Sequence, residues 1–119
     1  MKLIKITIII TLLIITYYSL QIPSKLTVPT NDKVGHFLAY STLSFQVFLL
    51  CNTLKQRIIG ILLIISYGIL MEFIQGFVPG REPSFYDMIA NSSGTFFSLG
   101  VVYLFQKQIL FVLRKINIQ

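Results

Sequence analysis

Four apolar runs, each close to the length of a membrane-spanning helix, dominate this 119-residue chain. A helix needs about 20 mainly apolar residues to cross the hydrocarbon core of a bilayer. Inside lipid the backbone has to satisfy its own hydrogen bonds, so each isolated span forms a helix. The sequence therefore predicts an all-α integral membrane bundle of four transmembrane helices, at about residues 4–22, 34–51, 58–78 and 86–105.

The composition argues against a water-soluble fold. Hydrophobic residues make up 55% of the chain and charged residues 12%, whereas an ordinary soluble domain has about 25% charged residues. A soluble protein of this size could not bury so much apolar surface. The single cysteine, Cys51, excludes an internal disulfide and a cysteine-based metal cluster. We predict one membrane domain over residues 1–119.

The basic residues lie at the ends of the apolar runs and form no single patch, which fits membrane orientation better than nucleic-acid binding. Seven fall on the side of the two termini and three on the other side, so the positive-inside rule places both termini in the cytoplasm. The seven are Lys2, Lys5, Lys55, Arg57, Lys107, Arg114 and Lys115, and the three are Lys25, Lys33 and Arg81. No small-residue cleavage site follows the first run, so we expect an uncleaved helix there. The mixed apolar and basic tail, 106–119, is predicted to lie on the inner membrane surface.

Glu72 lies inside the third apolar run. A charge near the bilayer centre costs at least about 2.5–3.5 kcal/mol, and such residues usually face protein or a wet cavity. Gln75 follows at i+3 and shares a helix face with Glu72. We therefore expect Glu72 to have polar partners on neighbouring helices.

Polar side chains of the other segments are predicted to gather at the same outer depth. Residues four apart share a helix face, and this spacing recurs in the second and fourth runs. The set comprises Asp32, His36 and Tyr40 in the second run, Asp87 and Asn91 in the fourth, and Arg81 in the preceding loop. Small residues let helices approach closely in membranes. The small residues at this spacing are Ala90, Gly94 and Ser98 in the fourth run and Gly35 and Ala39 in the second.

Structural roles stay open for the same residues. Capping would account for Asp32 and, together with Ser84, for Asp87. Arg81 would also suit a lipid phosphate at the membrane interface. Helix packing and hydrogen bonds inside the bundle would account for the others. These are His36, Tyr40, Glu72, Gln75 and Asn91.

Four short segments occur in a fixed order between residues 32 and 94. They are Asp32-Lys33-x-x-His36-Phe37-x-x-Tyr40, Glu72-x-x-Gln75, Pro79-Gly80-Arg81 and Asp87-x-x-x-Asn91-x-x-Gly94. This set resembles the VanZ-like family of bacterial membrane proteins. The resemblance implies a multi-pass protein of the bacterial cytoplasmic membrane that contributes to resistance against glycopeptide antibiotics of the teicoplanin type.

Two mechanisms fit these residues, and they leave open whether the protein is an enzyme. In the first, an outer-leaflet site recognises or modifies an envelope lipid or a peptidoglycan precursor, with His36 and Glu72 as a catalytic acid/base pair. The residues expected to bind its substrate are Asp32, Lys33, Tyr40, Gln75, Arg81, Asp87 and Asn91. In the second, the same residues bind a headgroup, an antibiotic or a partner protein without catalysis.

Several ligands and partners are compatible with such a site. His36, Glu72 and Asp87 offer the nitrogen and oxygen atoms that metals accept, but no linear metal motif is present, so the sequence assigns no metal and names no cofactor. The expected partners are membrane lipids and a lipid-linked cell-wall precursor or a glycopeptide, with no nucleic acid. A homo-oligomer is compatible with four short helices.

Overall fold

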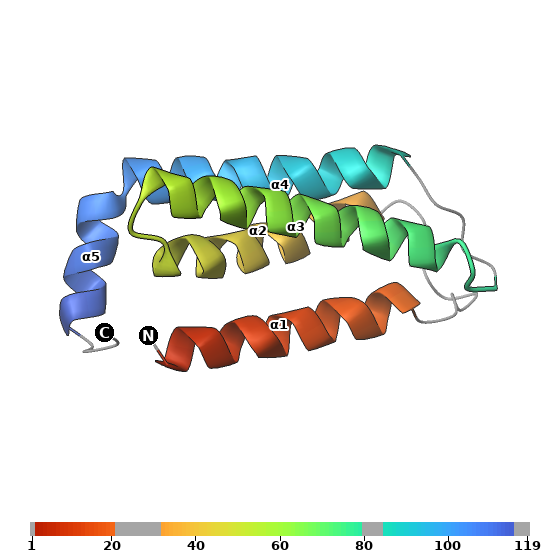
Figure 1. Ribbon diagram of the computed structural model, residues 1–119, viewed down its shortest axis with the longest axis horizontal. Coiled ribbons are helices and arrows are strands. Elements are labelled where there is room, and N and C mark those ends of the chain that lie inside the picture. Colours follow the sequence, from red (N-terminus) through yellow and green to blue (C-terminus); the bar gives the residue numbers. More distant parts are fainter. Residues whose placement is uncertain (1, 21–31, 80–84, 116–119) are drawn as a thin grey trace.

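Five helices make up the part of the chain described in this computed structural model, which comprises residues 2–20, 32–79 and 85–115, without the side chains of Asp32 and Lys33 (Figure 1). The helices are α1 (Lys2–Leu20), α2 (Asp32–Leu50), α3 (Leu54–Gln75), α4 (Phe85–Leu104) and α5 (Gln106–Lys115). No strand occurs in these residues, and this confirms the all-α prediction.

The start of α3 differs from the prediction because a capping motif precedes the apolar run. The helix begins at Leu54 rather than at residue 58. The backbone N–H of Gln56 donates to the Thr53 hydroxyl over 3.2 Å, and the Gln56 side chain accepts from the backbone N–H of Asn52 over 2.7 Å. This reciprocal arrangement closely resembles a capping box, which stabilises the first turn of a helix.

The end of α3 also differs, and the difference moves Glu72. The helix stops at Gln75 rather than at residue 78, and the N–H of Gly76 caps it by donating to the Phe73 carbonyl over 3.2 Å. Glu72 therefore lies in the last turn, about 4.5 Å along the axis from Gln75 at 1.5 Å per residue. Its carboxylate is close to the end of the helix, in the outer half where the sequence placed it.

The tightest helix contact joins α2 to α4. A Cβ atom added to Gly94 would lie 2.5 Å from the Phe37 carbonyl oxygen and 3.0 Å from the Ser41 nitrogen. Ser41 donates to the Gly94 carbonyl, and Ser98 donates to the Ser41 carbonyl. The close approach predicted for α4 is confirmed. The prediction for Gly35 is wrong, because this residue is exposed and an added Cβ would meet nothing within 4 Å.

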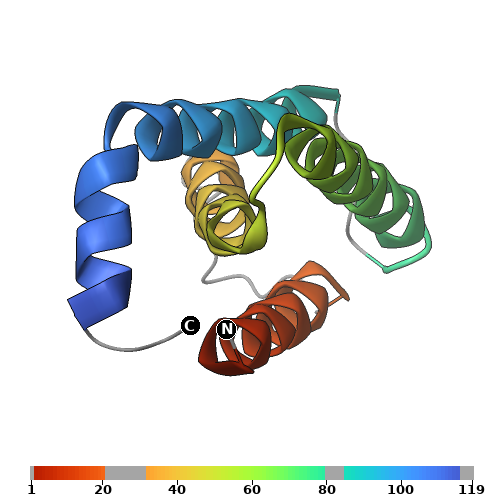
Figure 2. The same cartoon turned by 60° about the vertical axis from the view of Figure 1, so that its left-hand side comes forward.

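The first helix packs along α2 and α3 (Figure 2). Ile15 of α1 joins a buried cluster with Leu43 of α2 and Ile64 of α3. Thr16 is also hydrogen-bonded to the hydroxyl of Tyr67 over 2.6 Å. Apolar packing and a polar contact together fix α1 against the bundle.

The distribution of side chains is the reverse of that in a soluble protein. Many more large hydrophobic side chains are exposed than buried, whereas soluble proteins bury such residues preferentially. The buried polar and charged residues are Ser19, Ser44, Glu72, Gln75, Asp87, Asn91, Thr95 and Ser98. The described surface therefore suits a lipid environment.

Two helices, α1 and α3, are long and apolar enough to cross a membrane. A third candidate span exists if α4 and α5 are counted together, although the chain bends by 78° between them. The apolar part of α2, Val34–Leu50, is shorter than the other candidates. Within the described residues, length and composition thus support two or three spans.

Candidate functional site

Three helices bring an imidazole and two carboxylates together at one end of the bundle. His36 is in the second turn of α2, Glu72 in the last turn of α3 and Asp87 in the first turn of α4. One nitrogen or oxygen atom from each residue lies within 4.8 Å of the corresponding atoms of the other two. The predicted meeting of Glu72 with His36 and the fourth helix is therefore present in the structure.

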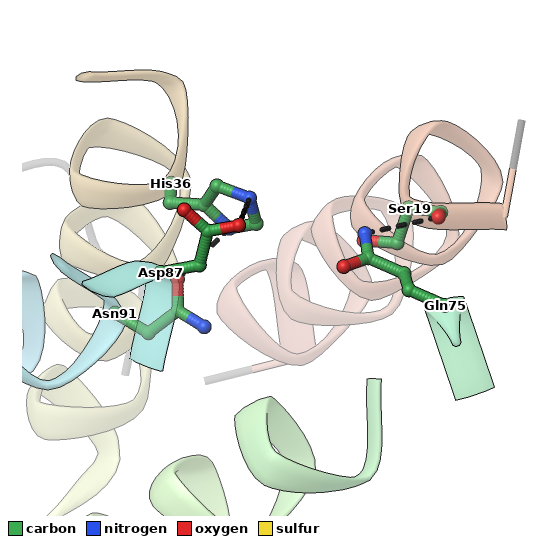
Figure 3. Close-up of polar contacts among 5 residues, drawn as sticks. All are labelled: Ser19, His36, Gln75, Asp87 and Asn91. Carbon is green, nitrogen blue, oxygen red and sulfur yellow. Dashed lines mark hydrogen bonds and ion pairs between the residues drawn. The ribbon is translucent and has the colours of Figure 1, made fainter. Parts of the chain in front are cut away.

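The ring of His36 is held between two residues of α4 (Figure 3). Its Nδ1 atom lies 3.0 Å from Oδ1 of Asn91, and its Nε2 atom lies 3.6 Å from Oδ2 of Asp87. An amide oxygen can only accept a hydrogen bond, so Nδ1–H is the donor. In the neutral ring, Nε2 then carries the lone pair and faces the carboxylate.

The site is strongly buried and acidic. Glu72 is 1% exposed and Asp87 is 5% exposed. Carboxylates removed from water need hydrogen bonds or compensating charge, because the lost hydration is costly. Such a site can exchange protons with a bound molecule, accept hydrogen bonds from hydroxyl or amine groups, or coordinate a cation.

Glycines set the spacing around this cluster. Gly94 lets α4 approach the backbone of α2, which brings Asn91 within reach of His36. An added Cβ on Gly68 would lie 3.3 Å from both the Asn91 amide nitrogen and a ring carbon of Tyr40. Larger residues at these two positions would push the site residues apart.

Gln75 does not join the cluster. Its amide nitrogen donates to the Ser19 carbonyl of α1 over 3.0 Å, and the two residues lie apart from His36, Asp87 and Asn91 in Figure 3. Gln75 thus links α3 to α1, which agrees with the alternative role of a hydrogen bond inside the bundle. The prediction that Gln75 binds a substrate stays a prediction.

The other candidate residues have different positions. Tyr40 is buried beside Gly68, with its ring centroid 6.1 Å from that of Tyr67. The side chains of Asp32 and Lys33 lie outside the described residues, and so does the whole of Arg81. The proposed capping partner of Asp87, Ser84, also lies outside them.

A cavity of about 490 Å³ lies between α3 and α4, next to the polar cluster. Tyr40 and Asn91 line it on the side of the cluster. The Nδ2 atom of Asn91 is buried and has no hydrogen-bond partner among the described residues. The other lining residues are mainly apolar: Ile64, Ile65, Gly68, Ile69, Phe85, Met88, Ile89, Ser92, Ser93, Thr95 and Phe96. Ligand pockets are commonly apolar with a few polar groups, and this cavity has that character.

The sequence did not single out some residues that line the cavity or join α2 to α4 away from the cluster. Ser44 of α2 donates to Thr95 of α4 over 3.1 Å in the buried interface below the cluster. Thr95 follows Asn91 by four residues, so the helical spacing already pointed to it. Met88 and Ser92 line the cavity, but no sequence pattern distinguishes them from lipid-facing residues.

Comparison with known proteins gives one relative and little else. No family model matches this chain, and no solved structure matches it. Over 113 residues the chain is 31% identical to "Uncharacterized protein C11E3.10" of the fission yeast Schizosaccharomyces pombe. The match covers 92% of this chain and 67% of the yeast protein.

Proposed function

We propose that this chain, which belongs to the same family as the Schizosaccharomyces pombe protein, is a four-span membrane protein that recognises or modifies a membrane lipid. Its polar cluster binds the headgroup at the outer leaflet. The cavity between α3 and α4 holds part of the hydrocarbon chain. Both termini lie in the cytoplasm.

The distribution of exposed side chains supports spans at α2 and α4. Ser44, Asp87, Asn91, Thr95 and Ser98 of these helices are buried, whereas the large apolar residues Val34, Leu38, Phe96 and Phe97 are exposed. The mean hydropathy of a helix averages its polar inner face with its apolar outer face. It therefore understates how apolar the outer faces of α2 and α4 are. The longest dimension of the molecule is 46 Å, close to the full bilayer thickness of about 40–45 Å.

The basic residues and α5 support the proposed orientation. The starts of α1 and α3 and the whole of α5 lie at one end of the bundle, opposite the polar cluster (Figure 1). Arg114 and Lys115 are in the last turn of α5, which is bent by 78° from α4. A mixed apolar and basic helix that turns away from a span suits the inner membrane surface.

The observation that carries the lipid proposal is the double role of Asn91. Its amide oxygen accepts from His36 in the cluster, while its amide nitrogen is a buried donor at the wall of the cavity. A buried donor of this kind is normally satisfied by a partner, and an oxygen of a headgroup or ester would serve. One molecule would then contact the cluster and the cavity together.

The described part of the cluster suits particular headgroups. Glu72 and Asp87 accept hydrogen bonds, so they favour the hydroxyl or amine groups of a headgroup.

His36 and Glu72 are the proposed acid/base pair of a hydrolysis or group transfer. The proposed pairing of Arg81 with a phosphate suits the planar guanidinium. Without catalysis, the same contacts would hold the headgroup and shield it.

A second candidate function is glycopeptide resistance through a lipid-linked cell-wall precursor. The four ordered segments between residues 32 and 94 that resemble the VanZ-like family favour it. The relative in a yeast favours the first candidate, because a lipid common to bacteria and fungi would serve both proteins whereas a peptidoglycan precursor would not.

Photoreactive lipids test the proposed function. The protein in vesicles is labelled with phosphatidylglycerol carrying a photoreactive group on its acyl chain, and labelled peptides are identified by mass spectrometry. We expect labels on the cavity residues of α3 and α4 and their loss in Ser92→Phe, which fills the cavity. Gly100→Phe, at an exposed site on the same helix with open space around it, is the matched control. Labelling spread evenly over all lipid-facing residues would contradict the proposal.

A further inference from the structure

We propose that His36, Glu72 and Asp87 bind a divalent transition-metal ion, with zinc as its best representative. The three residues come from three different helices, and one potential ligand atom from each falls within 4.8 Å of the others. The site goes beyond the proposed lipid function and does not depend on it, because ion binding requires no lipid. With the ion bound, His36 and Glu72 would act as its ligands and not as an acid/base pair.

The distances suit ligands that share one ion. Zinc binds histidine nitrogen and carboxylate oxygen at about 2.0–2.2 Å, so two tetrahedral ligands lie about 3.3–3.6 Å apart. Nε2 of His36 and Oδ2 of Asp87 are 3.6 Å apart. That distance is long for a hydrogen bond between them and close to the separation of two ligands on one ion. A Glu72 oxygen lies within 4.8 Å of a ligand atom of each of the other two residues, so binding of an ion would require it to move closer.

Asn91 prepares His36 for this role. Histidines that bind metals usually donate their other ring N–H to an oxygen, which fixes the tautomer and the ring orientation. Here Nδ1–H donates to Oδ1 of Asn91 over 3.0 Å. The lone pair on Nε2 is thereby directed at Asp87 and available to a metal.

The formal charge of the three residues and the types of ligand atom that they offer also fit a divalent ion. Two ionised carboxylates and a neutral imidazole carry a formal charge of −2, which a divalent cation balances. Glu72 and Asp87 are both buried, and burial makes this balance valuable. Imidazole with carboxylates suits zinc or manganese better than magnesium or calcium, which prefer oxygen ligands alone.

Three protein ligands leave a position for water or substrate, as in catalytic zinc sites. Asn91, which is bonded to His36, also lines the cavity between α3 and α4, so a molecule in that cavity would lie beside the proposed ion. The ion would also neutralise the local charge and give a phosphate oxygen a cation to bind.

Metal binding to the purified full chain in detergent tests the proposal. The protein is stripped with a chelator and titrated with zinc in competition with a chromophoric chelator, and the bound metal is measured by mass spectrometry. We expect one zinc per chain and a loss of affinity of more than about tenfold in His36→Gln, Glu72→Gln and Asp87→Asn. Asn91→Ala should lose about 10–100-fold, the usual effect of removing a residue that orients a metal-bound histidine.

Two controls separate this site from other zinc sites. Ser44→Ala removes a buried polar group of the same helix pair outside the cluster and should bind zinc normally. Cys51→Ser removes the cysteine and should also bind normally. Zinc affinity unchanged in all three ligand variants, or lost in Cys51→Ser, would overturn the proposal.

X-ray absorption of the zinc-loaded unmodified protein adds a test that does not depend on the folding of any variant. We expect only nitrogen and oxygen ligands, including one imidazole, and no sulfur. A failure to bind zinc would leave the lipid-labelling result unaffected, and a failure of lipid labelling would leave the zinc titration unaffected. The two proposals therefore fail separately.

Discussion

His36 and Asn91 are 55 residues apart in the sequence and are joined by a 3.0 Å hydrogen bond from Nδ1–H to Oδ1. The bond links α2 to α4 and fixes which ring nitrogen faces Asp87. The same amide lines the cavity between α3 and α4. A single side chain thus orients the imidazole and contacts the space in which a ligand would lie.

Charge and proton transfer at the site are tested by Glu72→Gln and His36→Gln, which keep size and much of the hydrogen bonding. If the unmodified protein changes the cellular lipid or cell-wall precursor profile as the catalytic proposal requires, we expect both variants to lose that change, because an acid/base pair needs both groups. Teicoplanin susceptibility is measured in parallel. Protein abundance should stay constant, as in the control Ser44→Ala. Full activity in both variants would exclude catalysis by this pair.

The contact between α2 and α4 is tested by Gly94→Ala. The added methyl group would meet the Phe37 carbonyl oxygen at 2.5 Å, and overpacking typically costs about 1–3 kcal/mol. We expect a lower midpoint of thermal unfolding in detergent. Gly100→Ala, on the same helix with open space around it, should be neutral or slightly stabilising, since alanine favours the helix by about 0.5–1 kcal/mol. Equal effects of the two substitutions would contradict the packing described.

The link between α1 and α3 is tested by Gln75→Leu. This substitution removes the donor to the Ser19 carbonyl. Hydrogen bonds between membrane helices average about 0.6 kcal/mol and reach about 1.7 kcal/mol, so a loss of stability in that range is expected. Gln46→Leu on α2 is the control with the same chemical change, because the Gln46 side-chain oxygen has no hydrogen-bond partner among the described residues. If both variants unfold at the same denaturant concentration, Gln75 does not hold α1.

The topology is tested with thiol reagents that cannot cross the membrane. Cys51 lies between α2 and α3, at the end proposed to face the cytoplasm. We expect it to react only after the membrane is permeabilised. A cysteine placed at Phe77 in a Cys51→Ser background should react in intact cells, because it lies at the opposite end of α3. Labelling of both positions from the same side would exclude a spanning α3.

The position of α5 is tested by spin labels placed one at a time over Gln106–Lys115. A helix lying in the membrane interface should give oxygen accessibility with a period of about 3.6 residues, highest around the exposed Leu110 and Phe111. Uniform accessibility to a water-soluble reagent would instead place α5 in the solvent.

Much of the architecture follows from local patterns in the sequence. Apolar runs locate the helices, and spacings of three and four residues bring Glu72, His36 and Asn91 to one end. The ends of α3 were misplaced because the Thr53-x-x-Gln56 motif starts the helix earlier and Gly76 stops it sooner. Both signals are present in the sequence and could have been used.

Other features depend on contacts that a single sequence does not specify. The partner of Gln75 is a backbone carbonyl of α1, and a carbonyl has no signature in the sequence. Gly35 and Gly94 fit the same small-residue pattern, yet only Gly94 lies against another helix. Which face of a helix meets its neighbour is decided by the packing of the whole bundle.

The molecule has two chemically opposite poles. Glu72 and Asp87 lie at one end, and the lysines and arginines of α1, α3 and α5 lie at the other. Dissolved salt weakens the attraction of the basic pole for anionic lipids but screens buried carboxylates much less. Raising the ionic strength would therefore weaken the proposed binding of the basic end to anionic lipids more than any binding of a ligand at the buried carboxylates.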